Sequence, residues 1–84
     1  MPLFRKKPVV IEAVQWGGSN VSEVTALQVE GSGVLRFSGD SVLIETREGT
    51  MTGDLGDWII QGVQGELYPC KPDIFDATYE AVEG

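Results

Sequence analysis

The stretch VLRFSGDSVLIETREGTMT, residues 34–52, decides the fold. Residues 34–37 and 42–47 are rich in branched and aromatic side chains, and the turn-prone run SGD at residues 38–40 separates them. This pattern predicts a β-hairpin. A second two-residue turn, EG, leads into the run TMT at residues 50–52, which alternates as a half-buried edge strand does. We therefore expect a three-stranded antiparallel meander.

A strand and a helix are expected on the amino-terminal side of this meander. Residues 8–16 (PVVIEAVQW) are rich in β-branched side chains, and apolar residues occupy both faces of the alternating pattern. We expect a central strand here, buried on much of both faces. After Gly17-Gly18, Asn20 and Glu23 form a capping-box-like start to a helix that runs to about Gln28. Its expected buried stripe consists of Val21, Val24 and Leu27.

Short strands and turns continue on the carboxyl-terminal side. The pattern predicts a loop at residues 53–57, a strand at 58–60, a turn at 62–65 and a returning strand at 66–70. Pro72 is suited to open one helical turn through Ala77, and residues 78–82 alternate again and are expected to pair with the first strand.

Together these elements predict a single α+β domain over residues 1–84. We expect a small, strongly bent, mainly antiparallel sheet or partial barrel, with one main helix and a short carboxyl-terminal helical turn. A chain of 84 residues holds one modest core. Self-association would add to its limited stability, so we expect a homo-oligomer.

Charge and composition exclude several classes of protein. The formal net charge of −7 argues against binding to duplex nucleic acid, because that affinity comes from cations that replace counterions on the phosphate backbone. Apolar residues make up 42% of the chain but occur in short runs, which argues against a membrane span. With a lone cysteine, Cys70, and no signal-peptide pattern, the expected compartment is the cytoplasm.

Residues suited to catalysis are scarce. The chain has no histidine, the commonest general base and a favoured zinc ligand, so we expect no enzymatic activity. Cys70 has no base beside it in the sequence and is expected to be a buried structural thiol. Asp54 and Asp57 lack the ligand pattern of a calcium loop and are expected to bond backbone amides in tight turns. We therefore predict no metal and no cofactor.

Two longer runs resemble a family of small, uncharacterised phage and prophage proteins. These runs are FRKKPVVIEAVQW at residues 4–16 and GDWIIQGVQGELYPCKPDIF at residues 56–75. The resemblance covers both ends of the chain and about half its length, whereas residues 17–50 carry little of it. It implies a phage-encoded accessory protein that acts in the cytoplasm of an infected bacterial host, and it supplies no catalytic residues.

The candidate binding residues are aromatic and basic. Large aromatic side chains can stack on a planar ligand while a nearby cation meets its phosphate; alternatively, the aromatics are core and the basic residues are a solvated arm. The candidates are Arg5, Lys6, Lys7, Trp16, Trp58, Tyr68 and Lys71. The first hypothesis is a protein that sequesters a small nucleotide-like host immune signal. The alternative is an interaction or structural factor that docks a host or virion protein.

Overall fold

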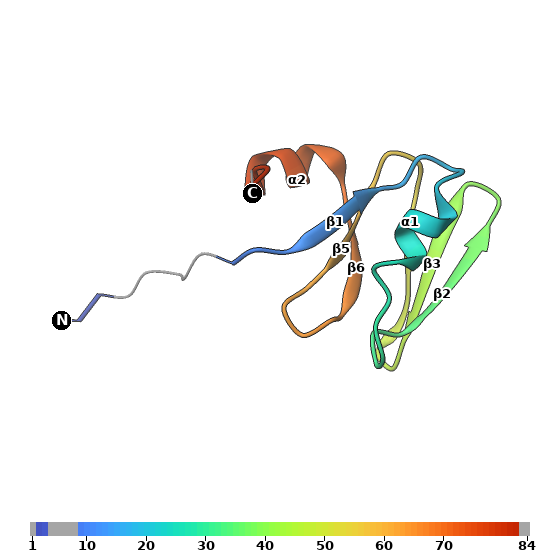
Figure 1. Ribbon diagram of the computed structural model, residues 1–84, viewed down its shortest axis with the longest axis horizontal. Helices are drawn as coiled ribbons and strands as arrows, with labels where there is room; N and C mark the ends of the chain where they lie inside the picture. Colours follow the sequence, from blue (N-terminus) through green and yellow to red (C-terminus); the bar gives the residue numbers. More distant parts are fainter. Residues whose placement is uncertain (1, 4–8, 83–84) are drawn as a thin grey trace.

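Six strands form two three-stranded antiparallel sheets in the computed structural model, which describes residues 2–3 and 9–82 (Figure 1). Sheet A has the order β1 (Glu12–Gln15), β5 (Trp58–Gln61), β6 (Leu67–Cys70). Sheet B has the order β2 (Val34–Ser38), β3 (Ser41–Thr46), β4 (Gly49–Gly53). The α+β class is thus confirmed, whereas the strands form two sheets where one bent sheet or partial barrel was expected.

Sheet B is the meander predicted from residues 34–52. In its register Phe37 lies opposite Val42, and Ile44 lies opposite Met51. The second turn differs from the prediction by one residue: Gly49 already pairs with Thr46, so the two turn residues are 47–48 and not 48–49. Gly49 has φ +133°, a backbone conformation that is accessible to glycine and strained for other residues.

In sheet A the central strand is β5, so the prediction that the first strand is central was wrong. β5 pairs with β1 on one side and with β6 on the other. Ile59 and Ile60, in the middle of β5, are both fully buried although they point to opposite faces of the sheet. In β1 the end residues Glu12 and Gln15 are exposed, which is the pattern of an edge strand.

Two short helices complete the fold, α1 (Val21–Thr25) and α2 (Pro72–Thr78). α2 is the longer, so the expected ranking of one main helix and one short turn is reversed. α1 ends at Thr25, three residues before the predicted end, and of the predicted stripe Val24 in the helix and Leu27 in the turn after it are buried, whereas Val21 is exposed. Residues 79–82 form no strand, contrary to the prediction. Neither helix is long and apolar enough to cross a membrane, judged over the described residues.

Asn20 precedes α1 but makes no side-chain cap on it. Its side-chain oxygen accepts a hydrogen bond from the Gly17 N–H at 2.8 Å, and its Nδ2 donates to the Gln15 carbonyl at 2.9 Å. The capping box predicted from the sequence is therefore replaced by a clamp that ties the start of the helix to the end of β1.

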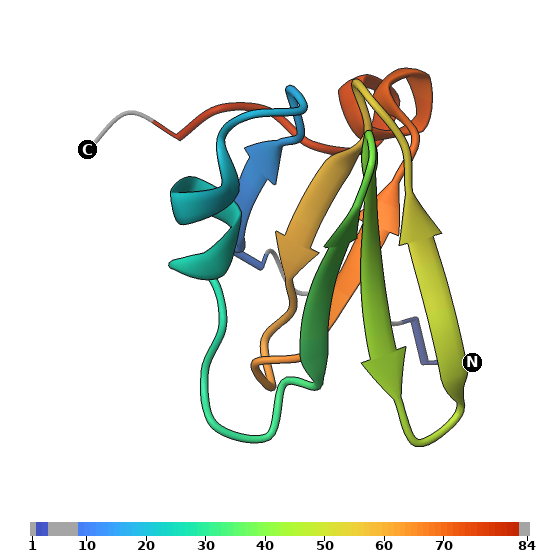
Figure 2. The same cartoon turned by 90° about the vertical axis from the view of Figure 1, so that its right-hand side faces the viewer.

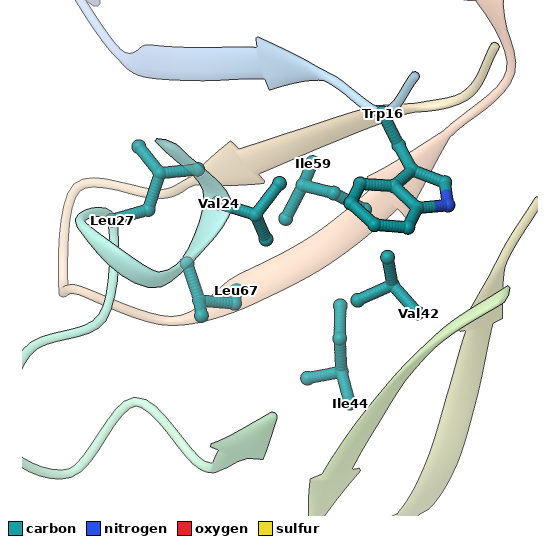
Figure 3. Close-up of a cluster of buried hydrophobic side chains, with 7 residues drawn as sticks. All are labelled: Trp16, Val24, Leu27, Val42, Ile44, Ile59 and Leu67. Atoms are coloured by element: carbon teal, nitrogen blue, oxygen red, sulfur yellow. The ribbon is translucent and has the colours of Figure 1, made fainter. Parts of the chain in front are cut away.

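The main core lies between the two sheets, and α1 covers one side of it (Figures 1 and 2). Figure 3 shows seven buried side chains converging: Trp16, Val24, Leu27, Val42, Ile44, Ile59 and Leu67. The Trp16 indole N–H donates to the Asp40 carbonyl at 2.7 Å, so its polar group is satisfied inside the core. The two sheets approach closely at Gly53, where a Cβ would lie 3.0 Å from Ile59 Cδ1.

Candidate functional site

The candidate site lies on the outer face of sheet A, the face turned away from sheet B. In the register, Ala13, Ile60 and Tyr68 form one cross-strand row on this face, and Gln15, Trp58 and Cys70 form the next. Ile60 is fully buried here but is not part of the main core. A second, smaller apolar cluster therefore exists on this side, under α2 (Figure 1).

Aromatic side chains make up most of this second cluster. The rings of Trp58 and Phe75 are stacked, with centroids 4.1 Å apart and planes 6° apart, and the centroid of Tyr79 lies 5.0 Å from that of Phe75. Phe75 lies in α2 and Tyr79 directly follows it, and the Tyr79 N–H donates to the Phe75 carbonyl at 2.8 Å, so one helix turn separates the two rings. Partial burial, followed by a side-chain hydrogen bond with Tyr79, raises the pKa of Tyr68 to about 12.

An apolar groove of about 470 Å³ runs beside these rings. One wall is the chain that enters and forms β1, and the other is α2 with the segment that follows it. Its lining is Val9, Val10, Ile11, Ala13, Trp58, Phe75, Tyr79, Glu80, Ala81 and Val82. Val10 and Val82 are 76% and 71% exposed, so apolar surface is left open to solvent along the groove. Glu80 is the only charged residue among the described residues of this lining.

Lys71 is engaged by two aspartates. Its Nζ donates to Asp57 Oδ2 at 2.9 Å and to Asp54 Oδ2 at 3.4 Å, and the hydrogen bond to Asp57 is the main cause of its raised pKa. Asp57 is only 3% exposed and also accepts the Asp54 backbone N–H at 2.9 Å, as predicted for an aspartate in a tight turn. This ion cluster joins the loop before β5 to the start of α2.

The structure therefore separates the residues that the sequence placed together. Trp58 and Tyr68 share the outer face of sheet A, while Trp16 is buried in the main core and Lys71 is held by aspartates. Arg5, Lys6 and Lys7 lie outside the described residues. Cys70, expected to be buried, is half-buried, and its thiol donates weakly to the Lys71 carbonyl at 3.6 Å.

Sequence reasoning missed Phe75 and Tyr79. The two residues are four positions apart, and both follow Pro72, the first residue of the helix. This spacing was a usable signal, because it places two aromatic side chains on the same side of a helical segment. The signal was lost because residues 78–82 were assigned to a strand, in which Tyr79 would have belonged to a different element.

A hollow of about 580 Å³ beside the loop 31–33 offers no built site. It is lined by three glutamates and Arg47, and its one buried polar side chain, Ser32, bonds the backbone of Val29. Within residues 2–3 and 9–82, no three acidic or thiol side chains lie close enough together to hold a metal ion. Comparison of the chain with models of protein families, with curated proteins and with solved structures found no match.

Proposed function

We propose that this protein is a non-catalytic binding module that docks an apolar segment of a partner protein in the groove on the outer face of sheet A. The observation that carries the proposal is the combination of an open apolar groove with exposed valines at both walls. Exposed apolar patches of this kind, next to polar surface, are typical of protein interaction sites. On the sequence resemblance alone, we place the partner in an infected bacterial cell, as a host or virion protein.

A protein segment suits this groove better than the nucleotide-like signal that was the first hypothesis. One face of the Trp58 ring is already covered by Phe75, which removes a stacking surface. The candidate cation nearest to this tryptophan in the chain, Lys71, is engaged by Asp57 and Asp54, and among the described residues the groove lining contains an acid and no cation. Among these described residues a phosphate would meet the carboxylate of Glu80, whereas an apolar side chain would bury valine and aromatic surface.

Site-specific photocrosslinking tests the proposal. We would incorporate p-benzoylphenylalanine in place of Val10, in the groove, and separately in place of Val34, which is 54% exposed on β2 of sheet B. Irradiation of infected bacterial cells is expected to give one discrete crosslinked protein from the Val10 position and none from the Val34 position. The same products from both positions, or no product from either, would contradict a docking site in the groove.

Calorimetry addresses the nucleotide hypothesis directly. We would titrate the protein with a panel of cyclic nucleotides and expect no binding heat. If one nucleotide binds and Trp58→Ala abolishes that binding while Val34→Ala does not, the groove is a ligand site and the proposed function is wrong.

A further inference from the structure

The strand that forms one wall of the groove has an open edge. β1 is the terminal strand of sheet A and pairs only with β5, and no other strand within the described residues lies along its second edge. α1 and the segment after α2 both reach past β1 on the side away from β5 (Figure 2), α1 on the side of sheet B and the segment after α2 on the outer side of sheet A (Figure 1). An edge of this kind presents unpaired N–H and C=O groups on which another strand can add.

The hydrogen bonds show which backbone groups point outward. The Trp16 N–H donates to the Asp57 carbonyl at 2.8 Å, and in an antiparallel ladder the residues that bond the neighbouring strand alternate. Val14 and Glu12 therefore direct their backbone groups to β5, while Gln15 and Ala13 direct theirs away from it. The outward direction of Gln15 agrees with its carbonyl accepting a hydrogen bond from Asn20 Nδ2, a group outside sheet A. The clamp by Asn20 closes the edge at Gln15 and leaves it open at Ala13.

The side chains along this edge alternate in character. Ala13 and Ile11 line the groove, whereas Glu12, between them, points to the other face and is exposed. Glu12 forms no ion pair with any residue that the structure describes. A strand added along β1 would thus place one set of side chains in the groove and the other set beside a carboxylate.

We propose that the partner segment binds as an extended strand along the open edge of β1, with apolar side chains in the groove and a lysine or arginine opposite Glu12. This inference rests on the proposed function and specifies its partner. Main-chain hydrogen bonds to Ala13 supply affinity, and the alternating pattern supplies specificity, as in other cases of strand addition. The protein's net charge of −7 favours a basic segment over a second copy of this acidic chain.

Synthetic peptides test the strand and its charge. The probe is acetyl-Val-Lys-Val-Lys-Val-Lys-Val-amide, and its counterpart carries glutamate in place of lysine. In ¹H–¹⁵N NMR titrations the basic peptide is expected to shift the amides of residues 11–13 and the Trp58 indole, and the acidic peptide is expected to shift neither. A copy of the basic peptide with N-methyl groups on the amides that face β1 is expected to bind roughly ten times more weakly, since hydrogen bonds to the edge are lost.

Protein variants separate the edge from general electrostatic attraction. Glu12→Lys is expected to weaken binding of the basic peptide by about two- to fivefold, the range of a cross-strand charge pair, and to strengthen binding of the acidic peptide. Glu48→Lys, at an exposed turn of sheet B, makes the same change in net charge and is the control. Ala13→Pro removes an outward N–H and leaves the ladder with β5 intact, so it is expected to reduce binding as the N-methylated peptide does.

The outcomes distinguish the two proposals. Shifts at the Trp58 indole without shifts at residues 11–13, or equal effects of Glu12→Lys and Glu48→Lys, would overturn the added strand and leave the groove as a docking site. Shifts at residues 11–13 that grow with protein concentration in the absence of peptide would identify a second copy as the occupant and overturn the basic partner. No shift in either region with any peptide, together with no crosslink at Val10, would remove both proposals.

Discussion

The two faces of sheet A are both apolar, but they are covered to different extents. The inner face meets a second sheet and α1, and its core side chains, such as Ile59 and Leu67, are at most 1% exposed. The outer face meets a single helix of seven residues and the segment that follows it. Ile60 is fully buried under this cover, while Val10 and Val82 at its margins are mostly exposed.

This difference separates stability from function. The inner cluster is enclosed by two sheets and α1, and its one indole N–H is bonded within the protein. The outer cluster is built on stacked rings and ends in an open groove beside a free strand edge. Substitutions on the inner face should therefore lower the free energy of unfolding, while those at the groove margin should change binding with little effect on the fold.

The adjacent residues Ile59 and Ile60 give the most direct measurement of this comparison. We expect Ile59→Ala to lower the free energy of unfolding by about 4 kcal/mol, because the closed inner core cannot collapse into the cavity. Ile60→Ala is expected to cost about 2 to 3 kcal/mol, because α2 can settle into the space. Urea denaturation measures both values. A larger loss for Ile60→Ala would show that the outer cover is the more rigid of the two.

Gly53 tests how tightly the two sheets meet on the inner face. A Cβ at this position would lie 3.0 Å from Ile59 Cδ1 and 3.5 Å from Pro69 Cβ, so Gly53→Val is expected to cost about 1 to 3 kcal/mol through overpacking. Gly17→Ala is the control, since its added Cβ meets only Asn20 Oδ1 at 3.5 Å. Thermal unfolding of the two variants should differ clearly. Equal melting temperatures would mean that the sheets separate easily at this point.

The stacked rings of the outer face are tested by a double-mutant cycle. Trp58→Ala, Phe75→Ala and the double variant are expected to give a coupling free energy of about 0.5 to 1.5 kcal/mol, as measured for aromatic pairs. Chemical denaturation with circular dichroism as the probe provides the four free energies. Additive losses would indicate that the two rings contribute independently and that α2 is held mainly by the Lys71 cluster.

The smallest expected effect is a loss of stability at alkaline pH. The pKa of Tyr68 is raised from 10.0 to about 12, and that of Lys71 is raised from 10.5, so both groups favour the folded state at neutral pH. This stabilisation is complete below pH 10 and is lost as the pH rises toward 12. Urea midpoints measured from neutral pH to about pH 12 should fall, and they should fall less in Tyr68→Phe and in Lys71→Met.

A pH dependence that is unchanged in both variants would contradict this assignment. The two variants also separate two contributions to how α2 is held. Tyr68→Phe acts on the aromatic cluster of the outer face, whereas Lys71→Met acts on the ion cluster that fixes the loop before β5.

Local elements were largely predictable from the sequence. The hairpin, the edge strand at residues 50–52, the strand at 58–60 and the helix that begins at Pro72 were all placed within about two residues. Their signals are turn residues and alternating side chains, which act over a few positions. The site was predicted in part, since Trp58 and Tyr68 share one face of sheet A. The sequence did not show that Trp16 is a core residue and Trp58 a groove residue, because Trp16 ends one apolar run and Trp58 begins another.

The rest depended on contacts between distant segments. Lys71 is adjacent in sequence to Cys70 and Pro72, and nothing in that neighbourhood indicates that Asp57 and Asp54 engage its charge. The prediction of a central first strand failed for a similar reason. The order of strands in a sheet depends on which strands pair with one another, and the composition of residues 8–16 does not specify these partners.

The amino-acid sequence by itself determined the α+β class, the meander and the absence of histidine, because these follow from residue types and from patterns of period two. Only the tertiary structure decided that β5 is central, that α2 lies over the outer face of sheet A, and that β1 keeps an open edge beside an apolar groove. The physical reason is that burial and charge pairing are properties of the assembled surfaces: Trp16 is buried and Trp58 borders a groove because of the segments that pack against them.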